Sequence, residues 1–439
     1  MHSFDDDAAI GEQLERRRRM AVEAWNLPAD VVVVVGAGEP VPVPGRGDRT
    51  YPYRAHSEYF YLTDRDDPGA ALAFDSSTGW TEFTVPVGPK QRLYGPVPEE
   101  RDLPAAGTRE SVHELASWLR ERTGKRVACL GCRVPEAPCD AEATSDARRA
   151  LNTVRRPKDP VELHRMRRAE EATRAGFAAA AAAVAPDVTE RAVQVELEAE
   201  FHRHGADDLL AFDTIVASGP NAAVLHFSPG ERVLQPGELV LIDAGAEHRR
   251  YSSDVTRTYA TSGEHTGAQA ALYAAVDEAR RAAIAHSRPG VAYRDVHREA
   301  SLVVGAHLVD FGLLRGEPES LFEAGAIGLF FPHGIGHMVG LGIRDAVAEP
   351  HEQVPDHPGY PHMRIDLPLR PGYVLTIEPG VYFVEGILRD RDNRERHRRA
   401  VDWDRVDGLL DFGGIRLEDD VLVTEGDPEV LTADIPLVP

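Results

Sequence analysis

Five residues in the C-terminal half of the chain have the types and surroundings that suit a pair of metal ions. They are four carboxylates and one imidazole, namely Asp243, Asp254, His337, Glu378 and Glu418. Such a set is rich in hard oxygen ligands and has no thiolate, which favours Mn²⁺ or a similar divalent ion over a structural zinc. Four negative ligands neutralise two dications, and two metals activate a water held between them. If the five side chains converge, we expect a metal-dependent hydrolase.

The first two of these carboxylates flank a predicted hairpin. An apolar run at 239–242 ends in Asp243, and an alternating run follows Asp254 after a polar turn. A turn centred between His248 and Arg249 would place the two aspartates directly opposite each other, with Cβ atoms roughly 4.5–5.5 Å apart. Two carboxylates that close should not both ionise in a half-buried site without a cation between them. The hairpin is therefore expected to present a carboxylate pair to a metal.

The remaining candidates lie in three short runs further along the chain. His333 and His337 belong to a run in which three glycines fall within seven residues and let the backbone approach a ligand closely. Glu378 ends a strand-like run that is cut off by proline and glycine. At 414–418, side-chain alternation sends Arg416 and Glu418 to one face of a strand and the residues between and before them to the other. An arginine therefore accompanies the last carboxylate.

These motifs together resemble the proline-specific members of the M24-type "pita-bread" metallopeptidases, the family of prolidase and aminopeptidase P. The resemblance extends from about Arg155 to the C-terminus. It rests on the segment 155–163, the Leu225-His226 pair, the aspartate hairpin, the His-Gly-Ile-Gly-His run at 333–337, the Ile-Glu-Pro-Gly run at 377–380 and the Arg-Leu-Glu run at 416–418. It implies a catalytic domain with a curved antiparallel sheet backed by helices.

The resemblance also implies a role for each candidate ligand. Asp243 and Glu418 would bridge or flank both metals, and Asp254 would hold one of them. His337 would hold the other together with Glu378. The expected cofactor is a pair of divalent ions, most simply Mn²⁺, with Co²⁺ or Zn²⁺ as alternatives.

Other positions would serve catalysis directly. Glu378 would also carry a proton toward the proline nitrogen, while His226 and His333 would line the cavity. Taken without the resemblance, His226 reads equally as a buried core histidine. Arg416 would either form an ion pair with the ligand carboxylates or grip the substrate.

Two arginines bear on which substrate the site accepts. Arg364 falls where prolidases carry an arginine that holds the free carboxylate of a dipeptide, a task suited to a bidentate guanidinium. An ordinary surface arginine is the alternative. Arg344 stands where the family has an active-site histidine, and arginine can donate hydrogen bonds but cannot accept a proton near neutral pH. The forty residues from Glu378 to Glu418 include a charged insertion like that of prolidases.

The expected activity is hydrolysis of a peptide with proline in second position. Proline forms a tertiary amide without the N–H that most proteases bind, and it fixes φ. A dipeptidase acting on Xaa-Pro is the leading expectation, and an aminopeptidase that removes the first residue of longer Xaa-Pro peptides is the alternative. A non-catalytic peptide- or protein-binding member of the fold is a third reading, against which the presence of all five ligands argues.

Composition limits the partners. The 439 residues carry a net charge of −23, which disfavours nucleic acid because phosphate contacts need a basic face. The basic run at 389–399 is interleaved with acids and is expected to be a solvated loop. No segment approaches the ~20 apolar residues of a membrane span, and the N-terminus lacks the features of a secretory signal. Three cysteines, interpreted as incidental, agree with a cytoplasmic protein, and the family's habit suggests a homodimer.

The chain is expected to have an α+β fold in two domains. Residues 1–155 would form an N-terminal α/β domain like that of the creatinase and aminopeptidase P group, and 156–439 the catalytic domain. The first would contain a charged helix at 12–25, an apolar strand at 31–35 and strand-and-turn material around Tyr51–Tyr61. Charge and two prolines near 151–160 mark the boundary, before a long helix that starts around Val161.

Overall fold

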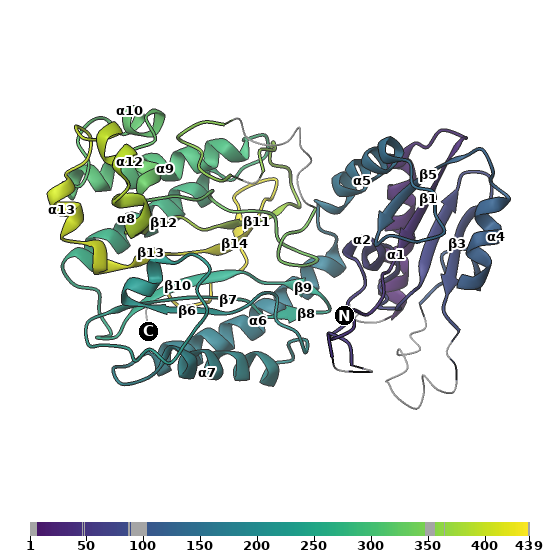
Figure 1. Cartoon of the computed structure of the whole chain (residues 1–439), viewed down its shortest axis with the longest axis horizontal. Coiled ribbons are helices and arrows are strands. Elements are labelled where there is room, and N and C mark those ends of the chain that lie inside the picture. Colours follow the sequence, from purple (N-terminus) through teal and green to yellow (C-terminus); the bar gives the residue numbers. More distant parts are fainter. Residues whose placement is uncertain are drawn as a thin grey trace. The chain divides into compact units, whose positions relative to one another are not determined.

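The computed structural model describes residues 7–45, 47, 49–86, 88, 103–346, 356–363 and 365–437. The chain divides into two compact units, Met1–Val161 and Glu162–Pro439 (Figure 1). Among the helices of the described residues, none combines the length and the apolar character that crossing a bilayer requires. The two units are taken separately below.

The first unit is built on a five-stranded mixed sheet in the order β4-β3-β2-β1-β5. β1 pairs in parallel with β5, and β3 with β4, whereas the other neighbours are antiparallel. The strands are β1 (Val31–Gly36), β2 (Ala71–Asp75), β3 (Gly79–Thr84), β4 (Thr108–Ser111) and β5 (Arg126–Gly131). The helices are α1 (Asp7–Trp25), α2 (Ser57–Thr63), α4 (Leu115–Arg120) and α5 (Ala141–Arg155). All of β1 is buried, as its run of valines predicts for a central strand.

The aromatic segment that the sequence assigns to strand and turn contains a helix, so this expectation is wrong for α2. His56 caps its N-terminus by accepting a hydrogen bond from the Glu58 backbone N–H, and Asp64 ends it in the left-handed conformation. Tyr59, Phe60 and Tyr61 are consecutive and all buried. Tertiary packing thus overrides the β propensity of the aromatic run.

Two of the three cysteines are not incidental, contrary to the sequence interpretation. Cys129 and Cys139 form a disulfide, and Cys132 is a free thiol. The chain returns past β5 after a turn, and an isolated parallel bridge between Val127 and Cys139 brings the second sulfur beside the strand. The spacing of the cysteines in the sequence does not predict that the chain passes β5 again at Cys139, so the disulfide could not be predicted from it.

The second unit contains several small antiparallel sheets that continue one another. These sheets are β10-β7-β6, β11-β14-β15 and the pairs β12-β13 and β8-β9. Isolated bridges tie β10 to the residue before β14 (Thr256 to Glu418) and β11 to the histidine run (Leu375 to Met338). The strands are β6 (Ile215–Ser218), β7 (Leu239–Ala244), β8 (Glu247–His248), β9 (Tyr251–Ser252), β10 (Val255–Ala260), β11 (Val374–Ile377), β12 (Gly380–Tyr382), β13 (Gly414–Arg416), β14 (Asp419–Leu422) and β15 (Glu429–Val430). Together they form the curved antiparallel layer that the resemblance predicts.

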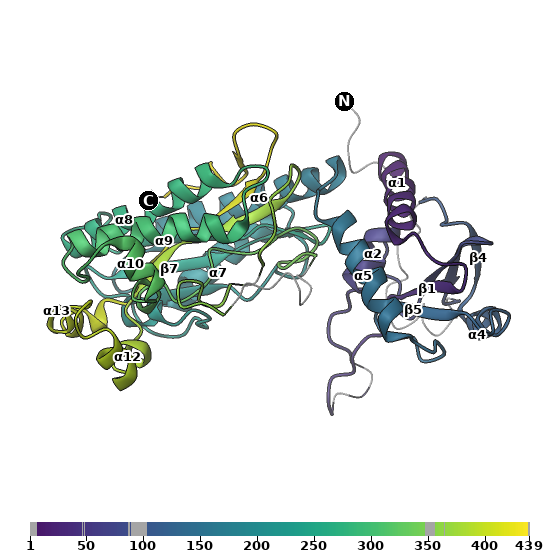
Figure 2. The ribbon, with the colours of Figure 1, turned by 90° about the horizontal axis from the view of Figure 1, so that it is seen from above.

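Helices cover this layer on two sides (Figures 1 and 2). α6 (Pro160–Ala183) and α7 (Glu190–Arg203) pack with β7 and β10 around one apolar core. α8 (Ala268–His286) and α9 (Tyr293–Asp310) pack with β11, β13 and β14 around the larger one. The predicted α+β architecture is therefore confirmed.

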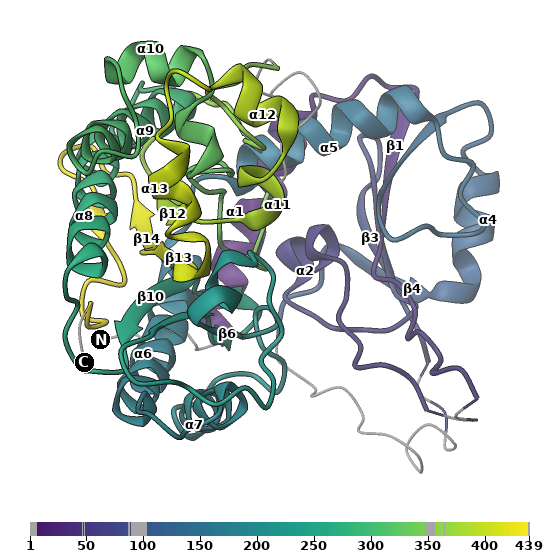
Figure 3. The same ribbon diagram turned by 60° about the vertical axis from the view of Figure 1, so that its left-hand side comes forward.

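Shorter helices complete this unit. They are α10 (Pro318–Glu323), α11 (Glu385–Leu388), α12 (Arg391–Arg396) and α13 (Trp403–Asp407), visible together in Figure 3. The sequence predicts a solvated loop for the charged run at 389–399. This prediction is wrong in part, because the run contains α12. Asp390 caps this helix by accepting a hydrogen bond from the Asn393 backbone N–H.

Candidate metal centre

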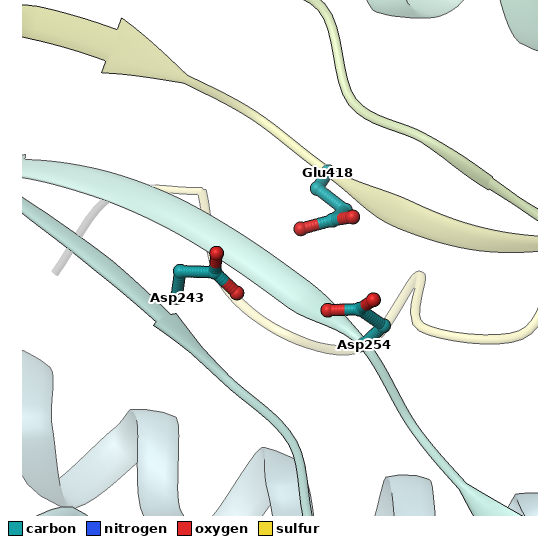
Figure 4. A group of neighbouring side chains, drawn as sticks. All are labelled: Asp243, Asp254 and Glu418. Atoms are coloured by element: carbon teal, nitrogen blue, oxygen red, sulfur yellow. The ribbon is translucent and has the colours of Figure 1, made fainter. Parts of the chain in front are cut away.

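Three carboxylates from three different strand ends meet in the second unit. One ligand oxygen from each of Asp243, Asp254 and Glu418 lies within 4.8 Å of the others (Figure 4). Asp243 is the penultimate residue of β7, Asp254 directly precedes β10, and Glu418 lies between β13 and β14. Three acidic groups gathered at this distance could together hold a cation.

The hairpin that carries the two aspartates has a different register from the predicted one. Asp243 faces Thr256, not Asp254. The turn is centred on Arg249 and Arg250, which both have positive φ, 49° and 70°, as a two-residue type I′ turn requires. Asp254 therefore lies diagonally across from Asp243 on the same face, a position from which side chains still reach each other.

Gly245 allows the chain to bend between the two aspartates. A Cβ at this position would lie 1.8 Å from the Ser253 carbonyl oxygen, so no other residue fits. Beside it, the Asp254 backbone N–H donates to the Asp420 carboxylate at 2.9 Å. The bend thus fixes the direction in which the Asp254 side chain leaves the backbone.

Thr256 brings the third carboxylate to this pair. Its carbonyl oxygen accepts a hydrogen bond from the Glu418 backbone N–H at 3.0 Å, and its hydroxyl donates to the Glu418 carboxylate at 2.7 Å. Since Thr256 also faces Asp243 across the hairpin, one threonine places Glu418 next to Asp243.

The other two predicted ligands approach along β11. The His337 carbonyl oxygen accepts a hydrogen bond from the Thr376 N–H at 2.8 Å, and the Glu378 N–H donates to the Ile335 carbonyl at 2.9 Å. Gly336, which lies between Ile335 and His337 in the chain, has a φ of 153°, and a Cβ there would lie 2.3 Å from the Thr376 carbonyl oxygen. The His337 Nε2 atom lies 3.4 Å from an Asp254 carboxylate oxygen. All five candidate ligands line one cavity of about 500 Å³.

Arg416 and Tyr382 connect the carboxylates to His333. The Arg416 guanidinium donates to Asp243 at 2.5 Å and to the Tyr382 hydroxyl at 2.9 Å, and the same hydroxyl lies 2.9 Å from His333 Nε2. Of the two roles considered for Arg416, the ion pair with a ligand carboxylate is the one seen in the structure. The alternation along β13 also holds, since Ile415 packs in the apolar core.

Burial and mutual repulsion dominate the electrostatics of the cluster. Burial, then the neighbouring carboxylates of Asp243, Asp420 and Glu378, raise the pKa of Asp254 well above its ordinary range. Burial and the same kind of repulsion raise the pKa of Glu418. The buried Oδ1 atom of Asp243 has no hydrogen-bond partner among the described residues. Acceptors without donors in a buried site fit divalent cations, which supply the missing positive charge.

The remaining predicted residues differ in how far the structure describes them. His226 lines the cavity with an exposed side chain, which rules out the alternative of a buried core histidine. His333 also lines it, with Nδ1 3.8 Å from the Glu378 carboxylate. Arg344 lines it too, and its side chain is exposed. Arg364 lies outside the described residues.

Several cavity residues escaped the sequence analysis. The lining includes Phe212, Asp213, Ile215, Phe227, Ser228 and His362. Thr256 and Tyr382 were missed as well, and they act from behind the lining by hydrogen bonding to Glu418, Arg416 and His333. Ile215 faces Asp243 across β6 and β7, and Gly380, two residues before Tyr382, faces Arg416. Period-2 alternation marks such residues as sharing a face, but only the strand pairing shows which face it is.

Comparison with known proteins agrees with this geometry. The model of the family described as Metallopeptidase family M24 matches residues 164–425. The Xaa-Pro dipeptidase of Stenotrophomonas maltophilia (strain R551-3) is 37% identical over 317 residues, 71% of this chain and 69% of the relative. That of Xanthomonas campestris pv. campestris (strain 8004) is 36% identical over 346 residues, 77% and 76% of the two chains.

Solved structures match nearly the whole chain. Aminopeptidase PepP of Pseudomonas aeruginosa is similar with a TM-score of 0.75 and 27% identity, covering 97% of this chain and 95% of that one. Aminopeptidase P of Escherichia coli with the inhibitor Pro-Leu gives a TM-score of 0.78 and 26% identity over the same shares. The similarity thus includes the N-terminal unit as well as the metal centre.

Proposed function

Because the chain belongs to metallopeptidase family M24, we propose that it is a dimetal peptidase that hydrolyses the Xaa-Pro bond of dipeptides. The observation that carries this proposal is the convergence of Asp243, Asp254 and Glu418 within 4.8 Å in a cavity that His337 and Glu378 also line. The relatives that bear the name Xaa-Pro dipeptidase support the substrate class.

We propose these five residues as the ligands of two divalent ions, Mn²⁺ in the first place and Co²⁺ or Zn²⁺ as alternatives. When bound, such ions polarise the scissile carbonyl and activate a water as nucleophile. Arg416 holds Asp243 in place through its ion pair. The unsatisfied Oδ1 of Asp243 supports the assignment, since a buried acceptor needs a cation or a donor.

The other side chains of the cavity would deliver a proton to the proline nitrogen or bind the substrate. The proline nitrogen has no hydrogen of its own in the peptide and must receive one as the bond breaks. Glu378 carries that proton, and His333, 3.8 Å away, can hold its carboxylate in the required orientation. His226 and His333 face the scissile carbonyl from the cavity wall. Arg344 and Arg364 bind the substrate, the latter through its terminal carboxylate.

A direct comparison of substrates tests the dipeptide assignment. Mn²⁺-loaded protein is given Ala-Pro, its C-terminal amide and a longer peptide that begins with Ala-Pro. A dipeptidase should show the highest kcat/KM for Ala-Pro and lose activity on the amide, because the terminal carboxylate is no longer charged. Ala-Ala serves as the control for the proline requirement.

The alternative is an Xaa-Pro aminopeptidase. The structural similarity of almost the entire chain to two aminopeptidases P favours it. Preference for the longer peptide in the same assay would establish this alternative and remove the carboxylate clamp from the proposal. A third reading, a binding protein without turnover, predicts purified protein that holds no metal and cleaves none of the peptides.

The cellular setting is part of the same proposal. We propose a cytoplasmic homodimer with domains at 1–155 and 156–439 and with neither nucleic acid nor membrane as partner, in keeping with a net charge of −23. Light scattering of the purified protein would measure the mass against twice 48.1 kDa. Thiol trapping in intact cells would report whether Cys129 and Cys139 are oxidised there, and a fully oxidised pair would argue against the cytoplasm.

A further inference from the structure

One wall of the cavity is a loop whose shape is not fixed by strand pairing. This segment, residues 219–230, begins with the short 3₁₀ helix η2 (Gly219–Ala223) and is called the His226 loop below. Leu225, His226, Phe227 and Ser228 line the cavity. His226 is exposed, so packing around its own ring does not hold it in place. Its neighbours Leu225 and Phe227 pack against an apolar cluster that includes Ala222 and Tyr382, and its position depends further on what fixes the two ends of the loop.

Both ends are held by one buried carboxylate, that of Glu190 at the start of α7. Its side chain is fully buried. One of its oxygens accepts hydrogen bonds from the Ser218 N–H at 2.9 Å, the Ser218 hydroxyl at 2.7 Å and the Asn221 amide at 2.8 Å. The other accepts from the Gly230 N–H at 3.3 Å. Ser218 directly precedes the His226 loop and Gly230 ends it, so the carboxylate closes the loop at its base.

The backbone at the start of α7 reinforces this closure. The Glu190 N–H donates to the Arg232 carbonyl and the Arg191 N–H to the Gly230 carbonyl, both at 3.0 Å. The Arg232 guanidinium donates to the Ser218 hydroxyl at 2.5 Å and pairs with Glu238. These bonds attach the loop's end to α7, but the bonds from Ser218 and Asn221 to α7 come through the Glu190 side chain.

We propose that Glu190 is a positioning residue that sets the place of His226 in the cavity wall, an inference that rests on the function proposed above. All four groups that reach the Glu190 side chain are donors, and its two oxygens accept them. Its loss would leave buried donors unpaired and release one attachment of the loop. The loop would then sample other positions, and His226 with it.

A double-mutant cycle tests this, with Mn²⁺-loaded full-length protein and Ala-Pro as the substrate. The variants are Glu190→Gln, His226→Ala and both together. We expect Glu190→Gln to lower kcat/KM about tenfold in the wild-type background and less than about twofold in the His226→Ala background, since coupled residues are not additive. Bound metal per chain, measured by mass spectrometry, should stay the same.

A matched control separates positioning from a general effect of losing a buried carboxylate. Glu58 in the other unit is also buried and accepts hydrogen bonds from the Gly131 N–H and the Arg148 guanidinium. Glu58→Gln should leave kcat/KM unchanged. Equal losses from Glu190→Gln in both backgrounds, or a loss of metal, would overturn the proposal.

Two further measurements cover the other outcomes. Should Glu190→Gln fail to fold, Asn221→Ala removes a single donor and should show the same non-additivity with His226→Ala at about threefold, whereas additive losses would refute the idea. If the wild-type protein cleaves no Xaa-Pro peptide, the proposed function fails by itself. Amide hydrogen exchange of residues 219–230 then decides, because Glu190→Gln should speed it and unchanged exchange would end the inference.

Discussion

Two groups of buried carboxylates, Asp75 in the first unit and the pair Asp254 and Glu418 in the second, differ in how their charge is balanced. Asp75 in the first unit is 1% exposed and accepts hydrogen bonds from Ser77, Lys125 and Arg122. Burial by itself would raise the pKa of Asp75, but these hydrogen bonds outweigh it and hold the pKa below the ordinary range. The first unit supplies its own counter-charges.

Asp254 and Glu418 in the second unit are short of counter-charge, whereas Asp419 in the same unit pairs with Arg257 and Arg280. Asp254 and Glu418 are as deeply buried as Asp75, at 4% and 2% exposure, yet burial and neighbouring acids raise both pKa values. Arg416 is the cation that lowers them, and it cannot balance the whole cluster. The difference fits a structural role for Asp75 and supports the proposal that Asp254 and Glu418 bind the divalent cations of a metallopeptidase.

The largest expected effect comes from breaking the metal cluster. Asp254→Asn should lower kcat/KM on Ala-Pro at least about 10³-fold, because metal catalysis supplies several kcal/mol and each 1.36 kcal/mol is a factor of ten. Steady-state kinetics with added Mn²⁺ measures it. Asp187→Asn, at an exposed aspartate of the same unit with positive φ, is the matched control. Near-normal activity of Asp254→Asn would remove Asp254 from the proposed ligands.

The second-largest effect is expected from removing Asp75, the buried carboxylate whose cationic partners lie in its own unit. Asp75→Ala should lower the free energy of unfolding of the first unit by about 3 kcal/mol, since Arg122 and Lys125 would be left largely buried without their partner. Denaturant titration followed by hydrogen exchange of β1 and β2 measures this. Peptidase activity of the folded fraction should stay normal, and a loss of metal from this variant would contradict the separation of the two clusters.

Metal addition should distinguish the units directly. At a free Mn²⁺ concentration one hundred times Kd, the second unit should gain about 2.7 kcal/mol of stability, because the ion binds the folded state alone. The first unit should gain nothing. Thermal unfolding with and without a chelator, with exchange assigned to each unit, checks both statements, and Asp254→Asn should lose the gain. An equal rise in both units would undo the comparison.

Acidification should reduce the contribution of His297 to the stability of the second unit, in the opposite direction to the raised pKa values of Asp254 and Glu418, which favour the folded state as pH falls. Burial lowers the pKa of His297 to about 4 despite its hydrogen bond with Gly359. Between its ordinary value of 6.5 and about 4, the unfolded chain binds one more proton than the folded one, so stability falls as pH falls, by about 1.4 kcal/mol per pH unit. The lowered pKa of Asp75 gives a loss only below its ordinary value of 3.8.

Unfolding free energies of chelator-treated protein between pH 7 and pH 4.5 measure the two slopes. His297→Asn should shift the slope of the second unit by up to about 1.4 kcal/mol per pH unit and leave that of the first unit as it is. Equal slopes in the wild type and in His297→Asn would show that His297 takes up its proton at no cost in the folded state.

The smallest effect concerns a charge that is not buried. Arg344→Ala should lower kcat/KM by about three- to tenfold, on the order of 1 kcal/mol, since an exposed guanidinium contributes hydrogen bonds that water partly replaces. Kinetics on Ala-Pro measure it, with Arg344→His as the variant that restores the family's usual residue. Unchanged kinetics would place the position outside the substrate's reach.

Much of the proposed metal centre could be read from the residues themselves. The carboxylates, the glycine-rich histidine run and the Pro-Gly after Glu378 are local patterns, and the alternation that puts Arg416 and Glu418 on one face needs only a period of two. The turn was misplaced by one residue because the sequence does not say that Arg249 and Arg250 would adopt positive φ. Tyr382 and Thr256 went unnoticed because their partners are distant in the chain.

The sequence by itself determined which chemistry the chain can carry out, since residue types and short spacings set the ligand chemistry, the charge and the strand-like runs. Only the tertiary structure decided where these groups meet. Thr256 and Glu418 are 162 residues apart and are joined by two hydrogen bonds, and Val127 beside Cys139 sets the disulfide. Such contacts depend on burial shared by the whole unit, and no local pattern in the chain encodes them.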